Sequence, residues 1–167
     1  LAWLDRLWQR TVEGARTVAL LDAGDGMGKT RLAAEFAGRV VAAGGVVWYG
    51  RAEEGVRLAA WAEAVSNHAR STASAELRLQ LGPRGAELTR IAPIVGERVA
   101  RLGSPAEVDA GAALFLVADA LDDLVERVSR HEPLLVVLDC LEHADQDTLT
   151  ALRRLATSTR PGRVLVV

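Results

Sequence analysis

The sequence predicts an α/β fold in which a parallel β-sheet is covered by helices on both faces. Two observations support this prediction. Short segments that are apolar on both faces alternate with segments of helical periodicity, which is typical of a parallel sheet buried between helices. In addition, a glycine-rich loop that ends in Gly-Lys-Thr follows the first apolar segment and precedes a helix, which is the arrangement of a phosphate-binding loop.

The first part of the chain predicts a helix, a strand, the loop and a second helix. Residues 1–14 carry apolar residues at helical spacing, and we expect Trp3 and Trp8 to be core residues. Residues 17–22 predict the first strand, and a pair of glycines ends the helix that follows the loop. Residues 46–49 predict a second, buried strand.

The middle of the chain predicts helices. Residues 57–70 have a helical period, whereas prolines and glycine divide residues 71–105 into short helical pieces. Residues 106–130 predict a long amphipathic helix, and we expect its acidic residues to face away from its apolar stripe. These acidic residues are Asp119, Asp122, Asp123 and Glu126. We therefore predict one P-loop nucleotide-binding domain over residues 1–167, with a helical insertion at about 52–130.

The last part of the chain predicts a strand, a helix and a fourth strand. The third strand covers residues 134–138 and ends in Asp139. The helix covers residues 145–157 with Asp145 as its N-cap, and the fourth strand begins after a Pro-Gly turn. Because the chain does not begin with methionine and stops within an apolar run, we expect it to be part of a longer protein, truncated after the fourth strand.

The composition predicts a cytoplasmic globular protein. Half of the 167 residues are hydrophobic, a quarter are charged and the net charge is −2, so there is no electrostatic reason to bind DNA or an anionic membrane. No apolar run approaches the roughly 18 residues that cross a membrane. The single cysteine, Cys140, excludes an internal disulfide and fits a reducing compartment.

The loop between the first strand and the second helix has the residue types that phosphate binding requires. Glycines allow successive backbone N–H groups to point toward an anion. Lys29, the only lysine among 20 basic residues, supplies a mobile positive charge for the β- and γ-phosphates. Thr30 offers a hydroxyl oxygen to Mg²⁺. The residues expected to contact the nucleotide are Ala23, Gly24, Asp25, Gly26, Met27, Gly28, Lys29, Thr30 and Arg31.

One position departs from the strict pattern G-x-x-x-x-G-K-[ST], because its first glycine is replaced by Ala23. Alanine lacks only the low-cost access to positive φ, so we expect binding to survive. The structural alternative is a glycine-rich turn without a ligand.

Asp139 is the expected metal anchor. An aspartate at the end of an apolar strand lies at the carboxyl edge of the sheet, where open α/β folds bind their ligands. We predict that Asp139 and Thr30 hold Mg²⁺, directly or through water, and that Lys29 acts with Asp139 in catalysis.

Two blocks of this sequence resemble the AAA-like STAND ATPase domains of large LuxR- and SARP-type bacterial transcriptional regulators and of adenylate cyclase fusions. Residues 134–149 read LLVVLDCLEHADQDTL and are similar to the family block LLVLDDLHWAD-x-x-S/T-L. Residues 26–36 read GMGKTRLAAEF and are similar to GIGKTRLLEEF, and residues 46–51 match the second strand of the family. The resemblance implies a P-loop NTPase core in which the strand near Arg163 lies between the first and third strands.

The sequence differs from this family beside the metal anchor. The family has a second acid there, whereas this chain has Cys140, and a thiol is a poor substitute for a carboxylate that orients water. Glu142 is the candidate for this catalytic role if its loop turns it inward, and is otherwise a solvated loop residue. No basic residue is evident beside Cys140, which favours a buried small side chain over a nucleophile.

The resemblance implies an ATP·Mg²⁺-binding switch domain of a multidomain signalling or transcriptional regulator, with weak or slow ATPase activity. Its cofactors would be ATP or ADP and Mg²⁺. The intact protein would self-associate, DNA would be bound only by domains outside this chain, and no membrane would be involved. Two alternatives remain open. One is a degenerate scaffold that binds nucleotide without hydrolysis, to which Ala23 and Cys140 point, and the other is a small-molecule kinase.

Overall fold

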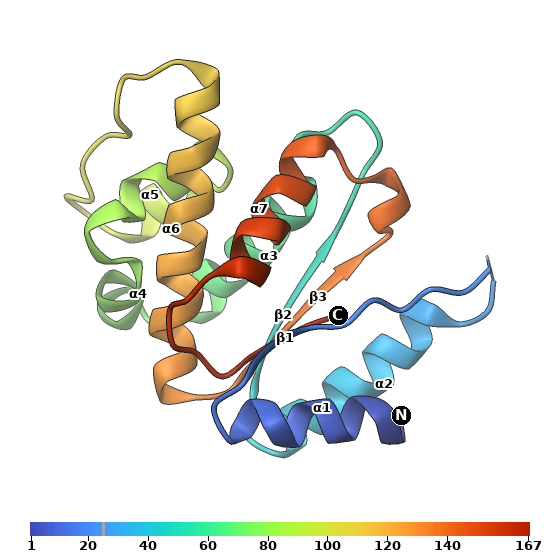
Figure 1. The fold of residues 1–167 in the computed structure, drawn as a ribbon. Helices are drawn as coiled ribbons and strands as arrows, with labels where there is room; N and C mark the ends of the chain where they lie inside the picture. The colour runs from blue at the N-terminus through green and yellow to red at the C-terminus, as the bar shows by residue number, and fades with distance from the viewer. Residues whose placement is uncertain (25) are drawn as a thin grey trace.

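The computed structural model describes residues 1–24 and 26–167, and it contains one parallel sheet with helices on both faces (Figure 1). The strands are β1 (Arg16–Val18), β2 (Val46–Arg51), β3 (Leu134–Asp139) and β4 (Val164–Val166). Their order in the sheet is β1-β4-β3-β2, and every pair is parallel. The predicted fold class is confirmed, and β4 lies between β1 and β3 as expected.

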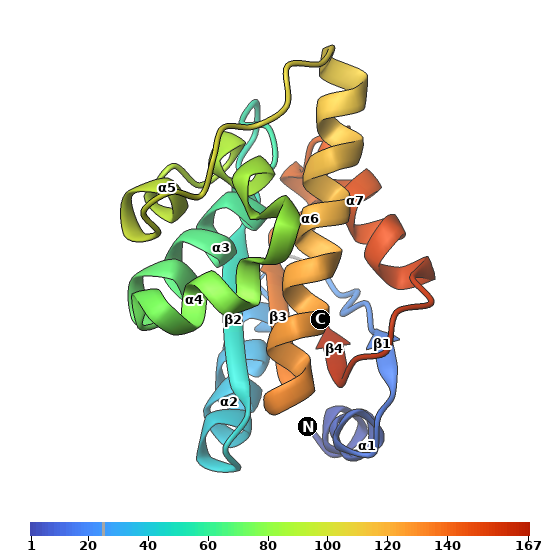
Figure 2. The same ribbon diagram turned by 90° about the vertical axis from the view of Figure 1, so that its left-hand side faces the viewer.

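The helices divide between the two faces of the sheet (Figure 1). The α-helices are α1 (Ala2–Val12), α2 (Lys29–Ala42), α3 (Ala59–Ser71), α4 (Ser74–Leu81), α5 (Ile94–Arg98), α6 (Ala110–His131) and α7 (Gln146–Thr157). The 3-10 helices are η1 (Gly82–Arg90) and η2 (Leu141–His143). Figure 2 shows α4 beside α6 and α5 beside α3, so that the segment between β2 and β3 is mostly helical, with a long loop that joins α5 to α6.

Each face of the sheet has its own apolar core because successive side chains of a strand point to opposite faces. Leu135 and Val137 of β3 pack in a cluster with buried residues of α1 and α2. Val136 and Leu138 pack in a second cluster with buried residues of α3, α6 and α7. Strand β3 is therefore covered on both sides, as its uninterrupted apolar sequence predicts.

Three local predictions differ from the structure. The first strand ends at Val18 rather than at residue 22, because its ladder with β4 stops where Ala19 donates its N–H to Val166. The helix predicted from residue 106 begins at Ala110, since Asp109 caps it by accepting two backbone N–H groups. Trp8 is buried as predicted, but Trp3 is 45% exposed because it lies off the stripe that α1 packs against the sheet.

The prediction that the acidic residues of α6 face away from the core is wrong. These residues form what we call the α6 carboxylate cluster, which consists of Asp119, Asp122, Asp123 and Glu126, and each is at most 9% exposed. Arginines from four other segments pair with the cluster: Arg16 of β1, Arg84 of η1, Arg154 of α7 and Arg160 of the loop before β4. Burial is tolerated because an arginine accompanies each carboxylate, and buried charges require such partners.

Among the helices that the structure describes, none has the length and apolar character of a membrane span.

Candidate functional site

The loop that leads from β1 into α2 presents the start of this helix to solvent. Gly28 is the N-cap of α2 and has φ 81°, and Gly26 has φ 73°, so both occupy the left-handed region that favours glycine. No described side chain caps the helix, which leaves the backbone N–H groups of its first turn available. A helix N-terminus with free N–H groups and a positive dipole end suits a phosphate group.

Lys29 lies against the backbone of this loop. Its Nζ donates to the carbonyl oxygen of Ala23 at 2.6 Å and to that of Gly24 at 3.3 Å. A phosphate oxygen is a stronger partner for an ammonium group than a carbonyl oxygen, because both groups are then charged. Lys29 is therefore held beside the loop by contacts that a bound phosphate could replace. Asp25, which was predicted to contact the nucleotide, lies outside the described residues.

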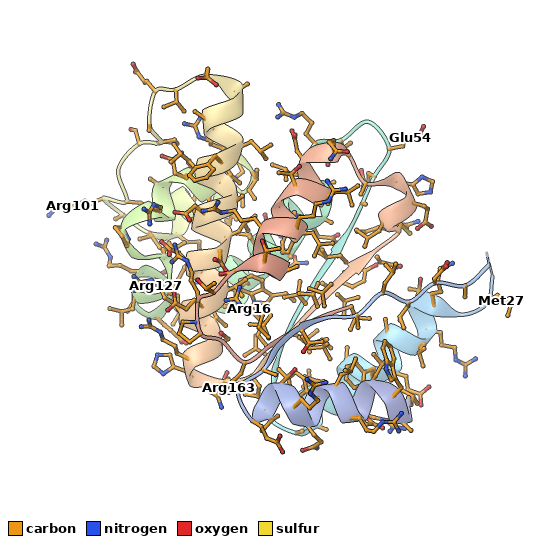
Figure 3. All side chains as sticks on the ribbon, in the orientation of Figure 1. Arg16, Met27, Glu54, Arg101, Arg127 and Arg163 are labelled. Atoms are coloured by element: carbon orange, nitrogen blue, oxygen red, sulfur yellow. The ribbon has the colours of Figure 1, made fainter. Side chains whose placement is uncertain are left out.

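Two adjoining cavities are lined by most of the predicted site residues, although Gly24 and Thr30 line neither of them. A cavity of about 390 Å³ is lined by Ala23, Lys29, Asp139, Cys140 and Glu142, together with Asp22 and apolar residues. A second cavity of about 770 Å³ is lined by Gly26, Met27, Gly28, Lys29 and Arg31, among others. Met27 is 74% exposed and lies at the outer end of the loop, pointing away from the protein (Figure 3). The fold thus brings the loop and the end of β3 to one edge of the sheet.

Asp139 is linked directly to the loop helix. The Thr30 hydroxyl lies 3.0 Å from Oδ2 and 3.2 Å from Oδ1 of Asp139, and the Cys140 N–H donates to Oδ1 at 3.0 Å. A carboxylate and a hydroxyl are the oxygen ligands that Mg²⁺ prefers, and Mg²⁺ is usually held by one or two such groups and by substrate phosphates. The residues at this edge therefore fit a magnesium ion bound with a nucleotide.

Tyr49 is a site residue that the sequence analysis missed. Its hydroxyl donates to Asp139 Oδ2 at 3.1 Å, and its side chain is 37% exposed rather than buried. Burial, followed by the charge and the hydrogen bond of Asp139, raises the pKa of Tyr49 to about 12. The phenol therefore keeps its proton at neutral pH and can donate a hydrogen bond. The alternation of side chains along β2 could have predicted this position. Trp48 is buried on one face of the sheet, so Tyr49 must lie on the other face.

Arg51 is a basic neighbour of Cys140, which corrects the expectation that this cysteine has none. Arg51 and Asp139 are partners in the register of β2 and β3. The Cys140 side chain is the main cause that raises the pKa of Arg51 above its usual value. Cys140 itself is partly exposed and has φ 57°, which is uncommon for a residue other than glycine.

Glu142 follows on η2, the short helix that begins after Cys140. Its side chain is exposed, and the residue lines the same cavity as Lys29 and Asp139. This location permits contact with a ligand in the cavity but does not require it. The catalytic role of Glu142 stays a prediction.

Comparison with known proteins agrees with this geometry. The model of the AAA ATPase domain family matches residues 1–167, which is the whole chain. Neither the curated proteins nor the solved structures contain a significant match. A full-length family match, the parallel sheet and the glycine-rich loop before α2 lead to one conclusion: the chain belongs to the AAA ATPase domain family.

Proposed function

We propose that the chain is an ATP·Mg²⁺-binding switch domain of a multidomain signalling or transcriptional regulator, acting in the cytoplasm with weak ATPase activity. The observation that carries the proposal is the position of Thr30, at the start of α2, within 3.2 Å of both carboxylate oxygens of Asp139 at the end of β3. P-loop ATPases use a hydroxyl and a carboxylate in these two places to hold Mg²⁺.

Each residue of the site has a separate task in nucleotide binding. The N–H groups at the start of α2 would hold the phosphates, and Lys29 would exchange the carbonyl oxygens of Ala23 and Gly24 for phosphate oxygens. Thr30 and Asp139 would hold the metal ion. When bound, Mg²⁺ would neutralise the charge of the β- and γ-phosphates.

Weak hydrolysis is proposed because Cys140 stands where a carboxylate would orient the attacking water. General-base assistance contributes typically 10²- to 10⁴-fold to a rate. Replacing Cys140 with aspartate should therefore raise kcat at least about tenfold and leave the affinity for ATP nearly unchanged. Steady-state ATPase measurements on the intact protein test this. If Cys140→Asp adds nothing and Glu142→Ala abolishes activity, Glu142 has the role instead.

A non-hydrolysing scaffold is the second candidate, and Cys140 is the observation that favours it. The same ATPase measurement separates the two candidates, since the scaffold has no turnover above the background of Lys29→Ala.

The output of the proposed switch would be self-association of the intact protein, which light scattering measures. We expect a larger mass with ATP than with ADP, and equal masses would argue against assembly. The single domain with an insertion at about 52–130 stays a prediction.

A further inference from the structure

We propose that Tyr49 is a positioning residue: its hydroxyl orients the Asp139 carboxylate and thereby strengthens the binding of Mg²⁺·ATP. This inference rests on the proposed function and extends it to a residue on β2, a strand at the edge of the sheet. It starts from the hydrogen bond of 3.1 Å between the Tyr49 hydroxyl and Asp139 Oδ2.

The register of the sheet places Tyr49 on the face that carries the metal site. Arg51 of β2 is the partner of Asp139, and Tyr49 is the partner of Val137, which packs with α2. Since partners in a parallel ladder share a face, the Tyr49 side chain lies on the α2 side of the sheet. A tyrosine two residues before the end of β2 can therefore reach forward along the sheet to the carboxylate at the end of β3.

The backbone that carries Tyr49 is fixed by its neighbours on the other face. Trp48 is 2% exposed, and its ring centroid lies 4.8 Å from that of His68 on α3. Gly50 lies so close to α3 that a Cβ there would be 1.8 Å from the carbonyl oxygen of Ala60. Because these contacts immobilise β2, the Tyr49 hydroxyl meets Asp139 with little freedom beyond its own two side-chain torsions.

The donors around Asp139 show what Tyr49 contributes. An ionised carboxylate accepts about four hydrogen bonds, and Thr30 has only one proton to share between the two oxygens. The Cys140 N–H occupies Oδ1 and the Tyr49 hydroxyl occupies Oδ2, so each oxygen has a donor that is independent of Thr30. These two bonds fix the plane of the carboxylate and leave Thr30 free to turn its lone pairs toward a metal ion.

A phenol suits this task because it donates a hydrogen bond without neutralising the acceptor. A lysine or arginine in the same place would form an ion pair with Asp139 and compete with Mg²⁺ for its charge. Tyr49 leaves the full negative charge of Asp139 available to the metal ion. Its effect on nucleotide affinity should therefore appear only when Mg²⁺ is present.

The test is calorimetric titration of the intact protein with ATP, once at saturating Mg²⁺ and once in EDTA. Tyr49→Phe removes only the hydroxyl oxygen and its proton. Since a single hydrogen bond contributes modestly, we expect the Kd for Mg²⁺·ATP to rise about 2- to 10-fold and the Kd in EDTA to stay unchanged. Thr150→Val is the matched control, because it removes an exposed hydroxyl of α7 and should leave both constants unchanged.

The outcomes separate this inference from the proposed function. If Tyr49→Phe binds Mg²⁺·ATP as tightly as the wild type, Tyr49 does not position the site. If it weakens binding equally with Mg²⁺ and with EDTA, Tyr49 shapes the cavity rather than the metal site, and the inference is also overturned. If the wild type binds no ATP, or binds it without any effect of Mg²⁺, the proposed function is refuted and the role of Tyr49 falls with it.

Discussion

Asp122 of the α6 carboxylate cluster offers a quantitative test of how the helical segment is held against the sheet. Its side chain is 4% exposed, accepts hydrogen bonds from Arg16 and Ser158, and forms an ion pair with Arg160. Arg16 Nη1 lies at 2.5 Å, Ser158 Oγ at 2.5 Å and Arg160 Nε at 3.1 Å. Arg16 reaches toward α6 from β1 (Figure 3), so this contact joins the sheet to the longest helix.

Replacing Asp122 with alanine should destabilise the protein by about 3–5 kcal/mol, because removal of one partner leaves a buried charge uncompensated. Arg16 is the residue left in this state. Its side chain is 9% exposed, its Nε and Nη2 have no partner in the described structure, and its other contact is the carbonyl oxygen of Leu155 at 3.3 Å. Arg160 contributes less to the loss, since it is 30% exposed and pairs with the remaining carboxylates.

Equilibrium unfolding in urea measures the effect, with an unchanged m-value as evidence that the variants unfold in the same manner. The matched control is Asp5→Ala, whose partner Arg39 lies at 3.2 Å in a pair that is about half exposed, so we expect a loss of about 0–1 kcal/mol. The double replacement Arg16→Met with Asp122→Leu should recover most of the stability, because an apolar pair can replace a buried ion pair. A loss for Asp122→Ala no larger than that of the control would refute this reasoning.

Three further predictions concern stability. Burial lowers the pKa of His68, so the folded state binds this proton less readily than the unfolded state. The free energy of unfolding should therefore fall as the pH drops below about 6.5. Urea titrations at pH 7.5 and 5.5 measure this dependence, and we expect His68→Leu to flatten it. Gly50→Ala should unfold the protein or destabilise it by more than about 3 kcal/mol, because the added Cβ would clash with Ala60. Gly38→Ala, in an open position of α2, should instead stabilise the protein by about 0.5–1 kcal/mol. Asp145→Ala should reduce the thermal unfolding temperature by the equivalent of about 1 kcal/mol, because it removes the N-cap of α7.

The elements of the fold could be predicted because their signals are local. An apolar run such as residues 134–138 predicts a buried strand wherever its neighbours lie, and Asp145 predicts a helix start from its own side chain. The pairing of Thr30 with Asp139 could also be anticipated, because strand ends of a parallel sheet meet at one edge. The structure brings these two residues into hydrogen-bonding distance.

The α6 carboxylate cluster could not be predicted, because its partners are distant in the sequence. Arg16 and Asp122 are separated by 106 positions, and an acidic residue on a helix is usually solvent-exposed unless such a partner is known. Tyr49 was missed for a different reason. Its strand was treated as buried on both faces, although β2 lies at the edge of the sheet and one face opens toward the site.

The most direct test of the account is the calorimetric titration of ATP into the wild type and into Lys29→Ala, each with saturating Mg²⁺. We predict binding of one ATP to the wild type and an affinity at least about tenfold lower for Lys29→Ala, because the variant lacks the charged hydrogen-bond donor for the phosphates. Binding of equal strength to both proteins, or no binding to the wild type, would contradict a phosphate site at the start of α2.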